Sequence, residues 1–199
     1  MLLAALRAGA QPQTLEQLAR EHAALIAVES GSHAVTAPLT LASDLTVTLN
    51  PDTGLSLGAV NGAAATLTAT GSGALALHAA PAVQAVELDL PAVSMAAPMT
   101  IAAPVTLRRT LSIAPDTGVT VTLDGAVSGS GGVNKDGSSI LVPTAANTYA
   151  GPTEVHAGTL RVAALAAGGA ASPVGASPAA PANLVLGKGT LFGRDLGSL

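Results

Sequence analysis

The sequence predicts an all-β protein, a right-handed parallel β-helix (solenoid) with a short N-terminal capping helix. Three observations predict this class. Hydrophobic residues make up 49% of the 199-residue chain, but Phe, Tyr and Trp together make up only 1%. Apolar and polar residues alternate with a period of two from residue 33 onward, which is typical of strands. Short stretches of sequence also recur at a nearly constant offset, which favours an array of similar units.

The scarcity of aromatic residues favours a solenoid over a β-sandwich. A sandwich core about 10 Å thick usually needs large aromatic side chains to span it. A solenoid interior is narrow, and ladders of aliphatic side chains fill it. Each coil of a parallel β-helix takes on the order of 20 residues, and successive coils stack about 4.8 Å apart.

The first segment, residues 1–32, differs from the rest of the chain. In "TLEQLAREHAALIAVE", residues 14–29, Thr14 and Gln17 fit a capping box. The apolar stripe of the expected helix consists of Leu15, Leu18, His22, Leu25 and Ile26. We expect this amphipathic helix to cover the N-terminal end of the solenoid, because an open first coil exposes unpaired backbone groups.

Strands follow from residue 33 to about residue 192. The stretch "PLTLASDLTVTLN" alternates Leu or Val with Thr, as a strand with one buried and one solvated face does. "GLSL", "ATLTA" and "ALAL" continue the pattern. Gly, Pro, Asn and Asp separate these runs, as in "NPDTG", which predicts many short strands.

Two copies of a longer unit are predicted within this region. "APLTL" begins at Ala37 and "APVTL" at Ala103, while "GSGALAL" and "GSSILV" begin at Gly71 and Gly137. Both pairs of segments are separated by the same offset along the chain. The copies are placed at about 37–102 and 103–168, with a partial third copy to residue 192 and a truncated tail at 193–199. Each copy would hold about three coils.

The most informative motif is "GSGGVNKDGSSILVPTAANTYAGPTEVHAGTL", which begins at Gly129 and contains the only Tyr of the chain. It resembles the autotransporter-associated β-strand repeat, also called the passenger-associated transport repeat. The residues that carry the resemblance are Gly131, Gly132, Val133, Lys135, Gly137, Leu141, Asn147, Thr148, Tyr149, Gly151, Thr153, Val155, Gly158, Thr159 and Leu160. Pro143, Pro152 and Ser139 depart from the usual pattern. The flanking sequences extend the resemblance to roughly residues 26–192.

Each motif residue is expected to have a structural role that needs no ligand. Gly151 and Gly158 are expected at coil corners with positive φ, and Asn147 is expected to bond neighbouring backbone. Tyr149 is expected to cover a corner with its hydroxyl in water. Thr153 to Leu160 should form two short strands around a turn. Replacing Lys135 by Ala is expected to leave the melting temperature unchanged, whereas Gly151→Val should lower it.

Composition argues against several classes of function. The 12 acidic and 8 basic residues are scattered, and the clustered basic residues and aromatic platforms of nucleic-acid binding are missing. The chain has no Cys, so it can form neither disulfides nor thiolate metal sites. The four His residues, at 22, 33, 78 and 156, lack metal-ligand spacing. No apolar run of about 18 residues predicts a membrane-spanning helix, and "MLLAALRAGA" is too short a candidate for a signal peptide.

Candidate catalytic groups are few. Glu87 and Asp89 share one strand face, Arg108 and Arg109 are adjacent, and Asp44 could lie near Arg109. A solvated ion-pair edge explains these residues better than a carbohydrate-cleaving site does, because neither cluster is large. The sequence therefore predicts no catalytic, cofactor or metal site.

Two functions stay open on the sequence. The resemblance implies a structural or adhesive segment of a large protein that is secreted or displayed on the outer membrane of a Gram-negative bacterium. The alternative is a glycan-binding or polysaccharide-degrading β-helix protein, which rests on fold analogy alone. The chain ends at "GRDLGSL" without a polar closing helix, so we expect a fragment of a longer protein that is prone to end-to-end self-association.

Overall fold

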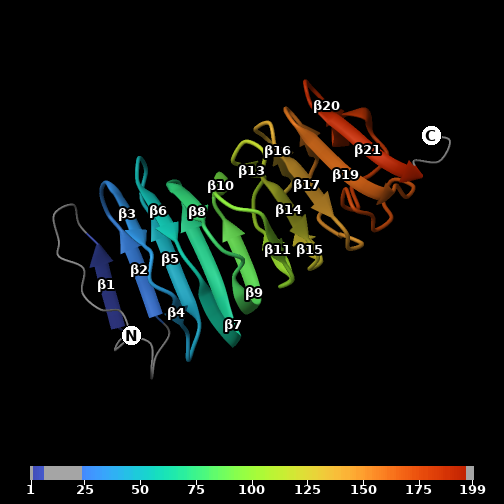
Figure 1. Ribbon diagram of the computed structural model, residues 1–199. Coiled ribbons are helices and arrows are strands. Elements are labelled where there is room, and N and C mark those ends of the chain that lie inside the picture. The colour runs from blue at the N-terminus through green and yellow to red at the C-terminus, as the bar shows by residue number, and fades with distance from the viewer. Residues whose placement is uncertain (1, 7–23, 196–199) are drawn as a thin grey trace.

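The computed structural model describes residues 2–6 and 24–195, and these form a parallel β-solenoid of about seven turns with almost no helix. The strands lie side by side along the axis of an elongated molecule, from β1 at one end to β21 at the other (Figure 1). Every strand pair in the three sheets is parallel, which confirms the predicted all-β parallel solenoid and excludes a sandwich of antiparallel sheets.

The strands form three ladders, here named sheets A, B and C. Sheet A follows the order β1 (Leu2–Leu6), β2 (Ala24–Val28), β5 (Leu45–Leu49), β7 (Val60–Gly71), β9 (Ala82–Asp89), β12 (Val105–Leu107) and β15 (Val127–Gly129), with β4 (Leu39–Thr40) also paired to β7. Sheet B contains β3 (Ser32–Val35), β6 (Gly54–Leu57), β8 (Ala74–Leu77), β10 (Ala92–Met95), β13 (Leu111–Pro115), β16 (Val133–Lys135), β18 (Thr153–Val155) and β20 (Leu184–Leu186). Sheet C contains β11 (Met99–Ile101), β14 (Thr120–Leu123), β17 (Ile140–Pro143), β19 (Thr159–Ala164) and β21 (Thr190–Asp195).

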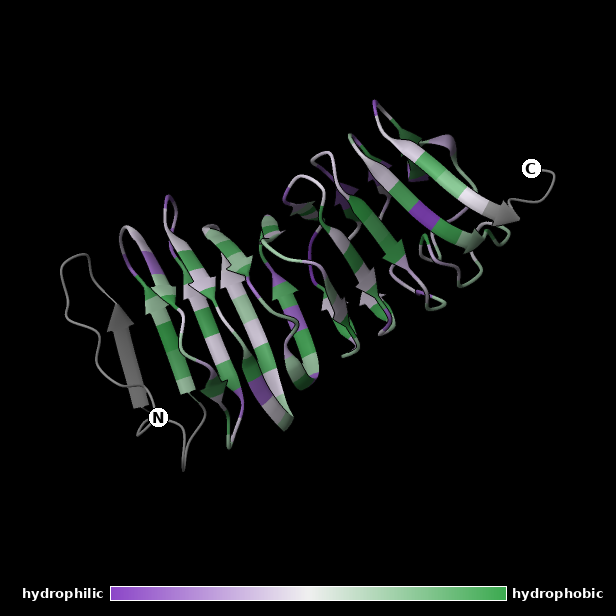
Figure 2. Ribbon diagram, in the orientation of Figure 1, coloured by the Kyte–Doolittle hydropathy of each residue, from purple (hydrophilic) through white to green (hydrophobic). Residues whose placement is uncertain are grey.

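The core is a stack of aliphatic ladders inside the coils. Along β5 the inward residues Leu45, Val47 and Leu49 are buried, and the Thr residues between them are partly exposed. Figure 2 shows the same alternation of hydrophobic and hydrophilic residues along many of the strands. Among the described residues, Tyr149 is the one aromatic side chain in the core. The prediction that small aliphatic residues fill a narrow interior is therefore confirmed.

The helix predicted over residues 14–29 is wrong in its last part. Ala24–Val28 is strand β2, which pairs with β1 on one side and β5 on the other. Leu25 and Ile26 therefore belong to sheet A. In this strand the β-branched residues Ile26 and Val28 are buried and Ala27 between them is partly exposed, which suits a pleated, half-buried surface. The remainder of the predicted capping helix, residues 14–23, lies outside the described residues. No helix in the described part of the chain is long and apolar enough to cross a membrane.

The coil length agrees with the expectation, but the offset between the two predicted copies does not correspond to whole coils. Successive partners in sheet A are Leu45, Leu67, Val86 and Val105, a spacing of about 20 residues per coil. Three coils, from Leu45 to Val105, therefore take fewer residues than the offset between the two predicted copies. Some matching segments consequently lie on different faces. "GSGALAL" contains β8 of sheet B and "GSSILV" contains part of β17 of sheet C, whereas "APLTL" and "APVTL" both belong to sheet A. The similar segments "PDTGLSL" at 51–57 and "PDTGVTV" at 115–121 also differ, since the first contains β6 of sheet B and the second contains part of β14 of sheet C.

The last described coil is longer than the others. Val133 pairs with Thr153, and Thr153 pairs with Leu184, so the second step takes clearly more of the chain than the first. The additional residues form a loop at 165–180, followed by the 3-10 helix η2 (Pro181–Asn183). This loop connects β19 of sheet C to β20 of sheet B and therefore occupies the place of a sheet A strand.

Candidate functional site

The motif at residues 129–160 occupies two consecutive coils near the C-terminal end of the solenoid. It runs from the end of β15 through β16, β17 and β18 into β19. Strand β16 stacks between β13 and β18 in sheet B, and β17 stacks between β14 and β19 in sheet C. Thr153–Val155 and Thr159–Ala164 are strands, as the motif predicted.

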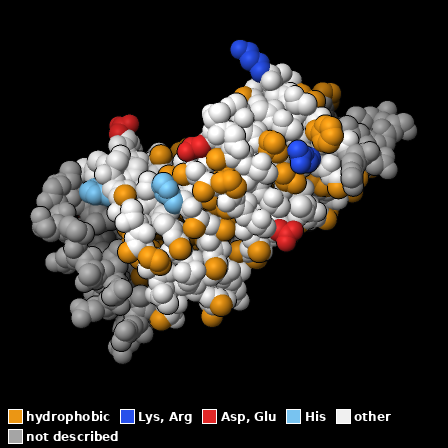
Figure 3. Space-filling model, viewed as in Figure 1, with side chains coloured by type: hydrophobic (Ala, Val, Ile, Leu, Met, Phe, Trp, Pro, Cys, Tyr) orange, Lys and Arg blue, Asp and Glu red, His pale blue; other side chains and the backbone are white. Residues whose placement is uncertain are grey.

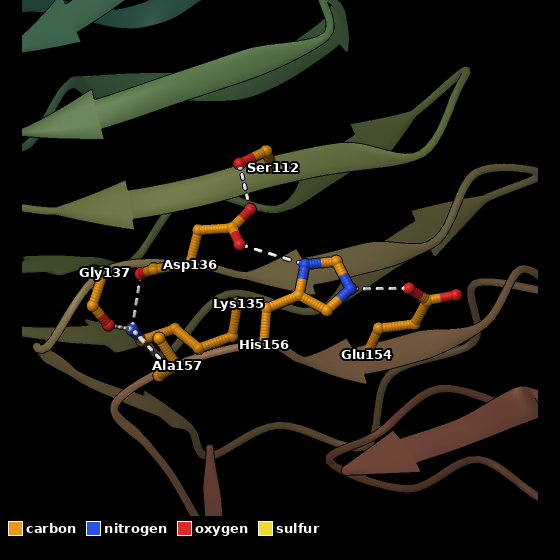
Figure 4. Close-up of polar contacts among 7 residues, drawn as sticks. All are labelled: Ser112, Lys135, Asp136, Gly137, Glu154, His156 and Ala157. Atoms are coloured by element: carbon orange, nitrogen blue, oxygen red, sulfur yellow. Dashed lines mark hydrogen bonds and ion pairs between the residues drawn. The ribbon is translucent and has the colours of Figure 1, made fainter. Parts of the chain in front are cut away.

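Lys135 is the most unusual residue of the motif because its side chain is fully buried. Its Nζ donates hydrogen bonds to the carbonyl oxygens of Asp136 at 2.6 Å, Gly137 at 2.7 Å and Ala157 at 3.3 Å. An ammonium has three N–H donors, so all three are used. The first two carbonyls belong to its own turn and the third to the next coil, as Figure 4 shows. Lys135 therefore ties the turns of two coils together from inside.

The electrostatic setting of Lys135 agrees with its burial. Burial lowers the pKa of the ammonium, and the neighbouring Asp136 carboxylate opposes this effect. This burial argues against the expectation that Lys135→Ala leaves the melting temperature unchanged. Period-two alternation from Val133 places Lys135 on the inward face, and this parity could have identified it in the sequence.

Two glycines form the turns around the Lys135 ammonium, and Gly158 makes room for it. Gly137 and Gly158 have φ values of 72° each, in the left-handed region that favours glycine. A Cβ on Gly158 would lie 2.9 Å from Lys135 Nζ and would also collide with the carbonyl oxygens of Ser139 and Gly137. The prediction of a positive φ at Gly158 is confirmed.

Gly151 is required for a different reason from the one predicted. It does not have a positive φ. Its backbone lies directly on the coil below, where its N–H donates to the Gly131 carbonyl at 2.9 Å, and a Cβ would lie 2.6 Å from the backbone nitrogen of Gly132. Gly131 and Gly132 are themselves packed against the backbones of Arg109 and Pro152. Close contact between coil backbones, and not backbone strain, selects glycine at this corner.

Asn147 and Thr148 extend sheet A without forming a regular strand. The Asn147 side chain accepts a hydrogen bond from the Val127 amide at 2.8 Å and donates to the Pro173 carbonyl at 2.9 Å. The Thr148 amide donates to the Val127 carbonyl at 2.8 Å. Asn147 thereby bonds the backbone of the preceding coil and of the following loop, which confirms the predicted role.

Tyr149 is buried, so the prediction of a solvated hydroxyl is wrong. Its side chain is 2% exposed, and its hydroxyl lies 2.6 Å from Thr153 Oγ1. Thr153 in turn donates to the Val174 carbonyl at 3.0 Å. Burial raises the pKa of Tyr149 to about 12, although the hydrogen bond to Thr153 acts in the opposite direction. The loop at 165–180 covers the ring, because a Cβ on Gly175 would collide with it.

The apolar residues of the motif continue the core ladders. In sheet B, Val133 pairs with Thr153 and Val155 pairs with Lys135, while in sheet C Leu141 pairs with Leu160. All of these side chains are buried. Thr159 pairs with Ile140 below and Thr190 above, so it lies within the same ladder of sheet C. Every motif residue named from the sequence therefore lies at a contact between consecutive coils or in the turns that these contacts hold.

Comparison with family models finds a match for this segment. Residues 133–162 match the model described as passenger-associated-transport-repeat. The segment is similar to that family, and it is called the passenger-associated-transport repeat below because of this match. Comparison of the chain with curated proteins and with solved structures found no match to either.

The outer face of the passenger-associated-transport repeat carries a polar cluster that the sequence did not single out. His156 Nδ1 lies 3.0 Å from Asp136 Oδ1, and His156 Nε2 lies 2.7 Å from Glu154 Oε2 (Figure 4). The Ser112 hydroxyl donates to Asp136 Oδ2 at 2.6 Å. A neutral imidazole has one N–H, so only the imidazolium can donate to both carboxylates. Hydrogen bonds to Glu154 and then to Asp136 raise the pKa of His156 accordingly.

This cluster of the passenger-associated-transport repeat has the residue types of a catalytic triad but a different connection. The Ser112 hydroxyl bonds the carboxylate of Asp136, whereas a triad requires the serine to bond the histidine. Both nitrogens of His156 are already engaged by carboxylates. No group of three or more His, Cys, Asp or Glu side chains in the described residues is placed to hold a metal ion. The geometry serves instead as a second tie, on the outside, between the coils that Lys135 joins inside.

The other candidates from the sequence lie on sheet A, away from the passenger-associated-transport repeat. Arg108 pairs with Glu87 at 2.7 Å, and Arg109 Nε lies 3.9 Å from Asp89 Oδ1. Asp44 accepts a hydrogen bond from the Thr66 amide at 2.8 Å and is not a partner of Arg109. The two Arg–carboxylate pairs join residues of strand β9 to the turn after its neighbour β12, as solvated edge pairs do.

Proposed function

We propose that this chain is a structural segment of an exported autotransporter passenger, secreted from or displayed on the surface of a Gram-negative bacterium. The observation that carries the proposal is a passenger-associated-transport repeat within a parallel β-solenoid. Its task is mechanical, either holding distant parts of the passenger away from the cell or presenting a regular surface for adhesion. No catalytic step is assigned to it.

The contacts of the repeat support a role in making the solenoid fold and remain rigid. A solenoid coil contacts only its neighbours, so its stability depends on the interface with the preceding coil. Within the repeat, Lys135 and Asn147 bond backbone groups across that interface. These polar contacts add to the aliphatic core and fix the register of one coil on the next, because each buried donor must meet its own acceptor.

Such an interface suits a chain that must fold after it has crossed a membrane. Each coil that stacks on a folded neighbour gains its ladder hydrogen bonds and core contacts at once, so folding can proceed along the axis. A coil pair with a strong interface provides a place where this process can start. We propose that the repeat at residues 133–162 has this function during export.

An export assay tests the proposal. The chain is placed between a secretory signal peptide and an outer-membrane translocator barrel in a Gram-negative host, and its surface exposure is measured by added protease and by antibody labelling. We expect the chain to reach the surface in a folded, protease-resistant form. Lys135→Met should reduce the surface-exposed amount, whereas Lys188→Met, a change at an exposed lysine, should not.

Two results would contradict the proposal. One is failure of the unaltered chain to reach the surface while a known passenger does so in the same vector. The other is equal export of the Lys135 and Lys188 variants, which would separate the repeat from export. A specific glycan-cleaving activity of the purified chain would favour the enzyme alternative instead.

A further inference from the structure

The C-terminal coil exposes a core position that the coils before it bury. Leu186 takes the register position of Val155, which is 0% exposed, yet Leu186 is 49% exposed. Val185 and Phe192 are 36% and 56% exposed, and with Leu186 they are the large exposed hydrophobic residues of the described chain. The Arg161 guanidinium lies 5.9 Å from the centre of the Phe192 ring.

These residues lie on the last strands of two ladders. Within the described residues, β20 pairs only with β18 and β21 only with β19. Their outer edges offer backbone N–H and C=O groups to a further parallel strand, and such edges are templates for pairing with another chain. The surface is therefore a strand-pairing edge with an apolar centre. It has the geometry of the contact between two coils.

The N-terminal end of sheet B is its counterpart. Strand β3 pairs only with β6 in the described part of the chain. Its inward residues His33 and Val35 are half-buried, whereas their partners Leu55 and Leu57 are fully buried. All strands of sheet B are parallel, so the outer edge of β20 in one molecule can form parallel ladder hydrogen bonds with the outer edge of β3 in another molecule.

Charge is also distributed unequally along the axis. Residues 24–86 contain three carboxylates, Glu29, Asp44 and Asp52, and no Lys or Arg, whereas Glu87 and Asp89 further along the axis are paired with Arg108 and Arg109. Residues 157–195 contain Arg161, Lys188 and Arg194 with one carboxylate, Asp195. On the face drawn in Figure 3, the Lys and Arg side chains lie toward the C-terminal end. The acidic end of one molecule and the basic end of another attract each other.

We infer that the chain associates head to tail with a second copy of itself, the β20–β21 edge of one molecule docking on the N-terminal edge that includes β3 of the next. The contact is heterologous, since two different surfaces meet, and it does not close on itself. Repetition of it builds filaments and not closed dimers. This inference does not depend on the proposed export function.

Sedimentation velocity on the purified chain tests the inference. We expect the average mass to rise above the 19.1 kDa of one chain as concentration increases, with a series of species and not a single dimer. High salt should weaken the association because it screens the attraction between the two ends. Hydrogen exchange at the amides of β20 and β3 should slow as concentration rises, and other amides should be unaffected.

A matched pair of variants locates the contact. Leu186→Lys places an ammonium in the apolar centre of the edge and should weaken association by about tenfold or more, because burying an unpaired charge is costly. Ala74→Lys adds the same charge at an exposed position of β8, inside sheet B, and should associate like the unaltered chain. A mass of 19.1 kDa at all concentrations would overturn the inference, as would association that Leu186→Lys leaves unchanged. If Leu186→Lys does not fold, slowed exchange confined to β20 and β3 still supports the inference, and its absence overturns it.

Discussion

Replacing Lys135 by Met should strongly destabilise the coils around the repeat. Met keeps most of the aliphatic stem but removes the ammonium, so the carbonyl oxygens of Asp136, Gly137 and Ala157 lose their donor. A hydrogen bond to a charged group contributes about 1.5–3 kcal/mol, but bringing the ammonium out of water offsets part of that gain. A buried acceptor left without its donor costs about 1–3 kcal/mol, and we expect a net loss of that order here.

That loss is large beside the total stability of an ordinary domain, about 5–15 kcal/mol. Urea unfolding followed by circular dichroism gives the free energy of unfolding, and hydrogen exchange at the Val133 amide reports the local effect. The Val133 amide donates across the coil interface to the Pro152 carbonyl at 2.8 Å. Lys188→Met is the control, because Lys188 is exposed. If Lys135→Met and Lys188→Met agree within about 0.5 kcal/mol, the buried ammonium does not hold the coils together.

Three other changes probe separate contacts. Gly151→Ala should destabilise the chain more than Gly118→Ala. An Ala at 118 has open space around its Cβ and costs only the backbone strain of φ 78°, about 1–2 kcal/mol, whereas a Cβ at 151 meets the backbone of the neighbouring coil. Equal unfolding midpoints for the two variants would refute the close-contact explanation. Ser139→Ala should leave stability unchanged or raise it by about 1 kcal/mol, since the buried Ser139 hydroxyl has no partner among the described residues; a clear loss in thermal melting would show a missed hydrogen bond. The raised pKa of His156 means that its charged contacts stabilise the fold fully below the unfolded-state pKa and are lost as pH rises through the folded-state pKa. His156→Gln should therefore lower the melting temperature at about pH 5.5 more than at about pH 8.5 relative to the unaltered chain; a pH-independent difference would count against the ion pairs.

The class of fold could be predicted because alternation and composition act on every coil alike. Leu45, Val47 and Leu49 face inward for the same reason as their equivalents elsewhere, since a strand exposes one side and buries the other. The offset between similar segments does not assign a strand to a face, because all three faces demand the same alternation. A strand such as that after "PDTG" fits sheet B in one place and sheet C in another, so sequence similarity does not fix the face.

The candidate site was predicted as a location but not as a set of contacts. The glycine at 158 could be assigned a positive φ from its position after a turn, and the structure agrees. The burial of Lys135 and Tyr149 was missed because a charged or hydroxylated side chain is ordinarily placed at the surface. Their acceptors, Ala157 and Thr153, come from the next turn and from the start of the next strand. Only the stacking of coils shows that these groups meet inside.

The long loop at 165–180 has a consequence for how such chains can diversify. It leaves the solenoid at the corner after β19 and returns at η2, while β18 still pairs with β20 and β19 with β21. Doubling the length of a flexible loop costs only about 0.6 kcal/mol in closure entropy. Apart from residues 172–175, which pack against Tyr149, Asn147 and Thr153, such a loop can therefore lengthen at small cost and alter what the outside presents while the stacked interior stays the same.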